Sequence, residues 1–124
     1  MRDFRELKVW QKAHELTLAI YQETGCFPRT EMYGLTSQLR RAAVSVGANI
    51  SEGAGKNSRP DFARFLLIAL GSASEVEYEL LLAHDLCYLN SKVYAELSAK
   101  VVETKRMLTG FIQYLSVSRT GTAP

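Results

Sequence analysis

Residues 60–89 read PDFARFLLIALGSASEVEYELLLAHDLCYL, and their apolar positions recur at intervals of three and four residues. At 3.6 residues per turn, this spacing places them on one face of an α-helix. Ser58 and Asp61 form a capping-box pattern before the run, and Pro60 suits a first helical turn. We predict a helix over about 60–89 with the core stripe Phe62, Leu66, Ala69, Ala73, Val76, Leu80 and Cys87.

Residues 65–70 read FLLIAL, so this part of the helix is apolar on every side. In a small protein, a helix of this kind has to be buried on more than one face. The pattern therefore predicts that copies of the chain assemble into a homo-oligomer.

The segment upstream carries a second helical stripe, which predicts a helix over about 31–52. The stripe consists of Leu35, Leu39, Ala42, Val46, Asn49 and Ile50. The opposite face is small or apolar, which favours a second close packing contact; it consists of Ser37, Val44, Gly47, Ala48 and Ser51. Residues 52–58, EGAGKNS, hold two glycines among polar residues and predict a loop.

Two further helices complete the pattern, over about 8–24 and 91–115. We expect Gly25 to end the first as a left-handed cap, and residues 116–124 to form a frayed tail. No stretch alternates with the period of a β-strand, and the connections are short. The sequence predicts an all-α fold, an antiparallel up-down four-helix bundle that forms a single domain over residues 1–124.

Composition limits the class of protein. Of the 124 residues 47% are hydrophobic, and no apolar run approaches the ~20 residues that span a membrane. The first eight residues lack the continuous apolar segment of a secretory signal, so we expect a cytoplasmic protein with no membrane association. Cys26 and Cys87 form no CxxC pair, which favours reduced, partly buried thiols over a disulfide.

The histidines and carboxylates do not form a recognisable metal site. A di-iron bundle places Glu three residues before His on each of two helices, but Gln11 precedes His14 and Leu81 precedes His84 at that spacing. Glu75 and Glu79 lie one helical turn apart and could ligate a hard cation, although a solvated face is the favoured interpretation. We predict neither a metal nor another cofactor.

The sequence contains no pattern that indicates a catalytic residue. Ser45, Ser51 and Ser72 lie among small residues, where close helix packing explains them. Residues 53–56, GAGK, lack the glycine spacing, the preceding strand and the Lys-Ser/Thr pair of a phosphate-binding loop. We therefore expect that the protein is not an enzyme.

Basic residues are concentrated between residues 36 and 64, although the net charge of +2 does not by itself establish nucleic-acid binding. This segment has only two acidic residues, Glu52 and Asp61. Its basic side chains form either a solvated face or a surface that contacts phosphates, more strongly if an oligomer repeats it. They are Arg40, Arg41, Lys56, Arg59 and Arg64.

Asn49 lies on the apolar stripe of the second helix, so we expect it to be buried and hydrogen-bonded. One interpretation is structural, with Asn49 fixing a nearby loop or helix end. In the other, Asn49 forms a polar network with Arg41, Ser45 and Glu52 that shapes a binding site.

Several phrases of the sequence resemble one bacterial family over residues 4–115. They are LKVWQKA (7–13), FP (27–28) with EMYGL (31–35), QLRRAAVS (38–45), ANISEG (48–53) and FLLIALGS (65–72). The chain resembles the four-helix-bundle family that includes proteins encoded in intervening sequences of 23S ribosomal RNA genes.

The resemblance implies a homopentameric barrel of four-helix subunits. It also implies a relationship to the accessory variability determinant protein of diversity-generating retroelements, which partners a reverse transcriptase and is thought to bind nucleic acid through a basic surface. On this basis Arg40, Arg41 and Lys56 are the implied phosphate contacts.

Two functional hypotheses follow. The first is a non-enzymatic oligomeric protein that binds RNA, DNA or a ribonucleoprotein through its basic patch, with a reverse transcriptase or another protein as a further partner. The alternative is a structural or protein-interaction module that binds no nucleic acid.

Overall fold

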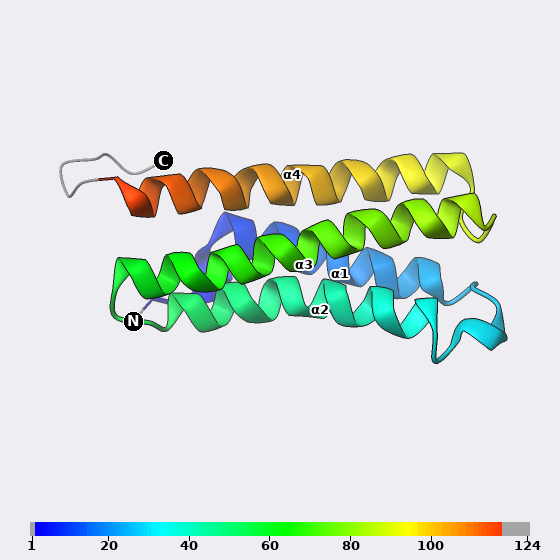
Figure 1. The fold of residues 1–124 in the computed structure, drawn as a ribbon, viewed down its shortest axis with the longest axis horizontal. Coiled ribbons are helices and arrows are strands. Elements are labelled where there is room, and N and C mark those ends of the chain that lie inside the picture. Colours follow the sequence, from blue (N-terminus) through cyan, green and yellow to red (C-terminus); the bar gives the residue numbers. More distant parts are fainter. Residues whose placement is uncertain (1, 118–124) are drawn as a thin grey trace.

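The computed structural model describes residues 2–117. Within this range the chain forms four α-helices, two short 3-10 helices and no strand, which confirms the all-α prediction (Figure 1). The elements are η1 (Phe4–Glu6), α1 (Lys8–Thr24), η2 (Arg29–Glu31), α2 (Leu35–Ala54), α3 (Arg59–Asp85) and α4 (Ser91–Ser116). No helix of the described range is both long and apolar enough to cross a membrane.

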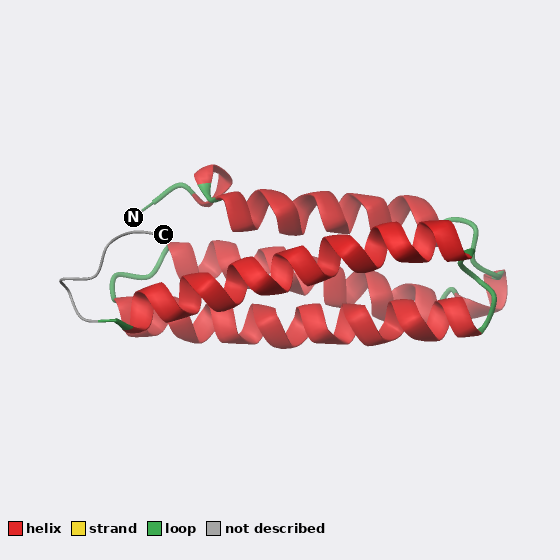
Figure 2. Cartoon of the chain, turned by 90° about the horizontal axis from the view of Figure 1, so that it is seen from above, coloured by secondary structure: helices red, strands yellow, loops and turns green. Residues whose placement is uncertain are grey.

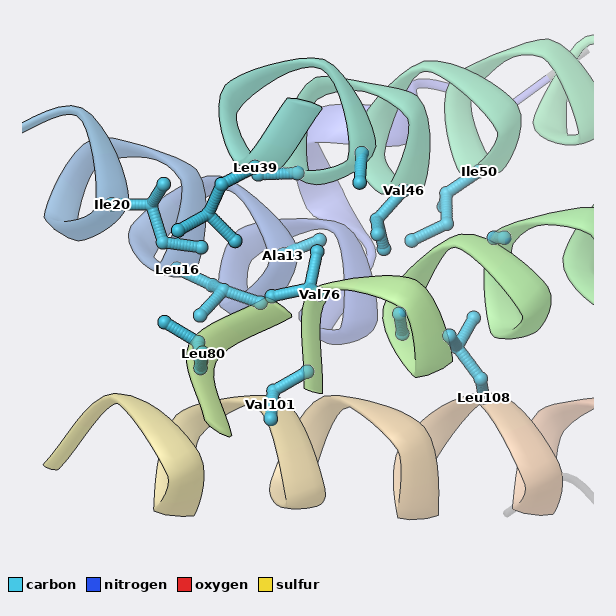
Figure 3. Close-up of a cluster of buried hydrophobic side chains, with 14 of the residues drawn as sticks. Ala13, Leu16, Ile20, Leu39, Val46, Ile50, Val76, Leu80, Val101 and Leu108 are labelled. Carbon is cyan, nitrogen blue, oxygen red and sulfur yellow. The ribbon is translucent and has the colours of Figure 1, made fainter. Parts of the chain in front are cut away.

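Each helix packs against two others, because α1 contacts α2 and α4, and α3 contacts the same two helices. All four lie along the long axis of the molecule (Figures 1 and 2). Every helix contributes fully buried side chains to one core, as Figure 3 shows for Leu16 of α1, Leu39 of α2, Leu80 of α3 and Leu108 of α4. The core stripes predicted from the sequence meet along this common axis, with two exceptions: Cys87 is exposed and Asn49 is half-buried.

The predicted bounds of α1 are confirmed, but α2 begins at Leu35 instead of residue 31. Residues 29–31 form η2, and the Glu31 carboxylate then folds back on the helix start. Its Oε1 accepts a hydrogen bond of 3.0 Å from the Leu35 backbone N–H. A side chain four residues upstream therefore satisfies a donor that the first turn of α2 leaves free.

The C-terminal part of α2 corrects the predicted loop at residues 52–58, because the helix continues through Gly53 and Ala54. Gly53 is buried against α3. A Cβ at this position would lie 2.9 Å from Phe62 Cδ1 and 2.9 Å from Phe65 Cβ. The absence of a side chain at Gly53 thus lets two helices approach closely.

At its C-terminus, α3 ends at Asp85, four residues before the predicted bound. Cys87 has a φ of 67°, and the Tyr88 N–H donates to the Ala83 carbonyl at 2.8 Å. This six-to-one bond with a left-handed residue is a Schellman motif, which stops the helix. The left-handed cap predicted at Gly25 is wrong, since its φ is −60°.

Ser58 Oγ accepts a hydrogen bond of 3.2 Å from the Asp61 N–H, so the predicted cap of α3 is present. Cys26 and Cys87 are both free thiols, but they are exposed, so the prediction of partial burial is wrong. The predicted tail lies outside the described residues from 118 onward, and Ser116 is the last residue of α4.

A band of apolar side chains on α3 faces away from the core, and we call it the outer stripe. It consists of Leu67, Ile68, Tyr78 and Leu81, which are 55%, 44%, 62% and 42% exposed. Leu67 and Tyr78 are eleven residues apart, which is close to three full helical turns, and Leu81 follows Tyr78 by three residues. These three side chains therefore lie on one side of the helix. The part of the helix predicted to be apolar all round therefore presents one of its sides to solvent in the single chain.

Where α1 packs against α2, the indole of Trp10 covers Gly47. A Cβ added to Gly47 would lie 3.5 Å from Trp10 Nε1, in ordinary contact. The indole also stacks on the His14 ring, with centroids 4.8 Å apart and an interplanar angle of 10°. Part of the small-residue face of α2 is thus covered within the chain by α1.

Candidate functional site

The five basic residues singled out in the sequence fall into two groups in the structure. Arg40 and Arg41 lie in the first half of α2. Lys56 lies in the connection between α2 and α3, and Arg59 and Arg64 lie in the first two turns of α3. Fifteen residues separate Arg41 from Lys56, which corresponds to about 20 Å along a helix. The structure therefore does not bring all five together in one patch.

In the first group, the half-buried side chain of Arg40 is hydrogen-bonded to α1. Its Nε donates to Thr24 Oγ1 at 2.8 Å and its Nη2 to the Tyr21 carbonyl at 3.2 Å. The guanidinium also lies 4.7 Å from the centroid of the Tyr21 ring. Because these acceptors belong to the last turn of α1, Arg40 caps the C-terminus of that helix.

Arg41, its neighbour, is exposed and makes one long hydrogen bond of 3.4 Å to Ser37 Oγ. Its guanidinium is therefore more available to an external partner than that of Arg40.

In the second group, Arg59 has a structural role comparable to that of Arg40. Its Nη2 donates to the Tyr114 carbonyl at 2.7 Å and its Nε to the Leu115 carbonyl at 3.3 Å. These carbonyls belong to the last turn of α4, so one cation links the start of α3 to the end of α4. The contact satisfies acceptors that the helix end leaves free.

Lys56, Phe65 and Arg64 form a small group that we call the Phe65 cluster. Lys56 Nζ lies 5.1 Å from the centroid of the Phe65 ring, and Arg64 Cζ lies 4.6 Å from it. Arg64 Nε also lies 3.7 Å from Asp61 Oδ1, but both side chains are more than half exposed, so this ion pair is weak. Two cations thus flank one aromatic ring at the surface.

The polar network expected around Asn49 is present in part, in a groove between α2 and α3. Asn49 Nδ2 donates to the Ser45 carbonyl at 2.8 Å and to Ser45 Oγ at 3.1 Å. The hydroxyls of Ser45 and Ser72 share a hydrogen bond of 2.8 Å, which joins the two helices. Asn49 is half-buried instead of buried, and Glu52 is exposed, with no side-chain hydrogen bond to the other described residues.

The groove, which we call the α2/α3 groove, has a volume of about 650 Å³. Its walls carry three serine hydroxyls, charged and amide groups, one tyrosine and one alanine. It is lined by Tyr33, Ser37, Gln38, Arg41, Ala42, Ser45, Ser72, Glu75 and Glu79.

We predicted a solvated face for Glu75 and Glu79, and this prediction is wrong for Glu79. Glu75 is exposed, but Glu79 is only 7% exposed, and its Oε1 is buried without a hydrogen-bond partner among the described residues. Burial raises the pKa of Glu79, and the charge of Glu75 raises this pKa further. One sequence signal was available, since Glu79 follows Val76 by three residues and precedes Ala83 by four, at the edge of the core stripe.

The histidines lie apart from this groove. His84 Nε2 and Ser91 Oγ are 3.3 Å apart, and the His84 ring stacks on that of Tyr94. The His14 ring stacks on the indole of Trp10. Among residues 2–117, no group of three or more His, Cys, Asp or Glu side chains is arranged to hold a metal ion.

Comparison with known proteins identifies a family and similar solved structures. Residues 5–110 match the profile of the family described as 23S rRNA-intervening sequence protein. A solved structure from Bacteroides thetaiotaomicron, described as a protein with unknown function from the S23 ribosomal protein family, is similar with a TM-score of 0.76. The sequences are 30% identical, and the match covers 85% of this chain and 98% of that one. The chain has no match among curated proteins.

Proposed function

The chain belongs to the family of 23S rRNA-intervening sequence proteins, and from this premise we propose that it is a non-enzymatic, homo-oligomeric protein that binds RNA or DNA. The Phe65 cluster is the proposed contact. The observation that carries the proposal is the placement of Lys56 and Arg64 over one half-buried aromatic ring, at 5.1 and 4.6 Å from the ring centroid.

The chemistry of this cluster suits a nucleic acid. Lysine and arginine attract phosphates, and the Phe65 ring beneath the two side chains holds these cations close together at the surface. The cluster lies next to the first turn of α3, where the helix dipole adds positive potential. Arg41 supplies a further cation about 20 Å away, a distance that an extended strand or a helical RNA can bridge.

Assembly is the second part of the proposal. We expect an antiparallel up-down bundle, supported by the short connections and by the packing of α1 against both α2 and α4. The outer stripe of α3 leaves large apolar side chains in solvent, which another copy would cover. In a closed ring of five copies the Phe65 cluster would be repeated by symmetry, so weak contacts would add up.

Salt-dependent binding tests the nucleic-acid contact. We would measure affinity by fluorescence anisotropy for a structured RNA and a duplex DNA at several salt concentrations. Replacing Lys56 and Arg64 by alanine is expected to lower affinity and to make the slope of log K against log salt shallower, by about 0.7–0.9 for each phosphate that is no longer neutralised. The control variant Lys92→Ala with Lys100→Ala removes the same amount of charge from α4. It should change neither the affinity nor the salt slope.

Affinity that is indifferent to salt and to the Lys56 and Arg64 substitutions would contradict the nucleic-acid proposal. Assembly is tested separately by light scattering, where five copies of the 13.9 kDa chain give about 70 kDa. A monomer at micromolar concentration would contradict assembly.

A structural or protein-interaction module is the second candidate, and one observation favours it. Arg40 and Arg59 donate to carbonyls of helix ends, so two of the five basic residues serve the fold. Under this hypothesis the outer stripe serves assembly and the remaining charges serve solubility. The Lys56 and Arg64 substitutions would then leave both partner binding and assembly unchanged.

A further inference from the structure

The α2/α3 groove carries an unbalanced charge. Glu75 and Glu79 from α3 contribute two carboxylates, and Arg41 from α2 contributes one guanidinium. The ion pairs within 4.0 Å in the described part of the chain include none of these three side chains. When both carboxylates are ionised, these three side chains sum to a charge of −1, which one additional cation would neutralise.

The position of Glu79 specifies where that charge would bind. Its side chain lines the groove although the residue is only 7% exposed, and Oε1 has no hydrogen-bond partner in the described residues. A buried acceptor without a donor costs free energy, so folded proteins seldom leave one unmatched. A ligand that brings N–H donors into the groove would remove this cost.

We propose that the α2/α3 groove is a binding site for a cationic nitrogen group, a guanidinium or an ammonium, with the Glu79 carboxylate as its main acceptor. Glu75 supplies the second carboxylate. Ser45, Ser72 and Gln38 supply neutral oxygens at the groove wall, where additional N–H groups can donate.

The groove fits a nitrogen cation better than a metal ion. Calcium takes six to eight oxygen ligands and magnesium an octahedral set, whereas two carboxylates beside an arginine offer too little negative charge. The volume of about 650 Å³ far exceeds that of an ion and leaves space for a cationic group together with the alkyl stem that carries it. Tyr33 and Ala42 provide apolar surface for the alkyl stem that carries such a cation.

Two sources can supply this chemistry: a free amine or guanidine compound, or a lysine or arginine side chain from a second copy of the chain. The second source would deepen the assembly part of the proposed function, since the groove would then be completed across the subunit interface. Neither source depends on nucleic-acid binding.

Ligand-observed saturation-transfer NMR with n-butylguanidinium, which has the chemistry of an arginine side chain, tests the site. The matched neutral probe is n-butylurea. Signal transfer is expected for the cation only, and Glu79→Gln is expected to weaken it by about ten- to a hundredfold in affinity, as for the removal of one charge-assisted hydrogen bond. Glu96→Gln, which removes an exposed carboxylate from α4, should leave binding unchanged.

Light scattering on the same proteins identifies the source. If a second copy fills the groove, n-butylguanidinium and Glu79→Gln will each shift assembly to higher protein concentration. If a free compound fills it, the probe binds while assembly stays as in the wild type. Should Glu79→Gln fold poorly, Glu79→Asp provides a variant that keeps the charge and should retain part of the affinity.

The proposal is overturned if the cation and the urea bind alike, or if the cation binds wild type and Glu79→Gln equally. It is also overturned if the probe does not bind and Glu79→Gln assembles as the wild type does. Nucleic-acid affinity of the same variants is a separate readout, so failure at the groove is distinguishable from failure at the Phe65 cluster.

Discussion

The hydroxyl of Tyr88 donates a hydrogen bond of 2.9 Å to Glu31 Oε2, and this contact joins the α1–α2 connection to the α3–α4 connection. The other oxygen of the same carboxylate accepts from the Leu35 N–H. One acidic side chain thus links the start of α2 to the turn that follows α3.

Tyr88→Phe is expected to raise the pKa of Glu31. In the wild type the Leu35 N–H and then the Tyr88 hydroxyl hold this pKa below its ordinary value of 4.5. The lowered pKa stabilises the fold above about pH 4.5, and this contribution is lost as pH falls through the folded-state pKa. NMR titration of Glu31 should show the rise, and acid unfolding of Tyr88→Phe should depend less steeply on pH. An unchanged pKa would contradict the role of the hydroxyl.

Gly53→Ala is expected to lower the free energy of unfolding by about 1–3 kcal/mol, because its Cβ would overlap the side chains of Phe62 and Phe65. Gly110→Ala is the matched control. Nothing lies within 4 Å of a Cβ at that helical position, so the free energy should rise by up to about 1 kcal/mol. Urea unfolding measures both, and equal effects would show that helix propensity alone decides them.

Cys87→Gly is expected to raise the free energy of unfolding by about 1 kcal/mol, because glycine adopts the φ of 67° without the steric cost of a Cβ. Its thiol is exposed, so the substitution removes no buried side chain from the core. Cys26→Gly makes the same chemical change at another exposed position, where φ is not positive. Thermal unfolding should therefore show stabilisation at position 87 only.

Arg59→Ala is expected to lower the free energy of unfolding by about 1–3 kcal/mol, since two carbonyls at the end of α4 lose a charged donor. Arg64→Ala should stay within about 0.5 kcal/mol of the wild type, because its side chain is exposed and its ion pair long. Chemical denaturation compares the two. A similar decrease for both would mean that Arg59 is no more structural than Arg64.

Glu79→Gln is expected to stabilise the protein more at pH 8 than at pH 5. Burial, and then the charge of Glu75, raises the pKa of Glu79 above its ordinary value of 4.5. A carboxyl that binds its proton more tightly when folded costs stability as pH rises above the unfolded value. Tyr33, Arg41 and Glu75 are the other titratable groups that line the groove. Urea unfolding at both pH values should show this difference, and Glu96→Gln should show none.

The sequence was sufficient to predict the all-α fold and the bounds of α1, because apolar periodicity and local helix stops are properties of neighbouring residues. Gly53 shows the limit of this reasoning. A glycine beside a second glycine and polar residues indicates a loop, yet here it serves the approach of α3. Whether a glycine breaks a helix or admits a neighbour depends on what packs against it.

The candidate site shows the same limit for charges. Arg59 and the Tyr114 carbonyl that it contacts are 55 residues apart, so no local pattern reveals that this arginine is engaged. Lys56 and Arg64 could be identified as basic, but their shared position on Phe65 needs the three-dimensional arrangement. The sequence favours a solvated face for Glu75 and Glu79, because no histidine or matching carboxylate completes a metal site, yet burial differs sharply between the two.

The stacking of Trp10 on His14, above Gly47, gives the molecule a built-in optical reporter, because the chain has a single tryptophan. Its fluorescence originates at the seam between α1 and α2. Separation of α1 from α2 would uncover the side of the ring that faces Gly47, so the emission spectrum should shift to the red as water reaches the indole.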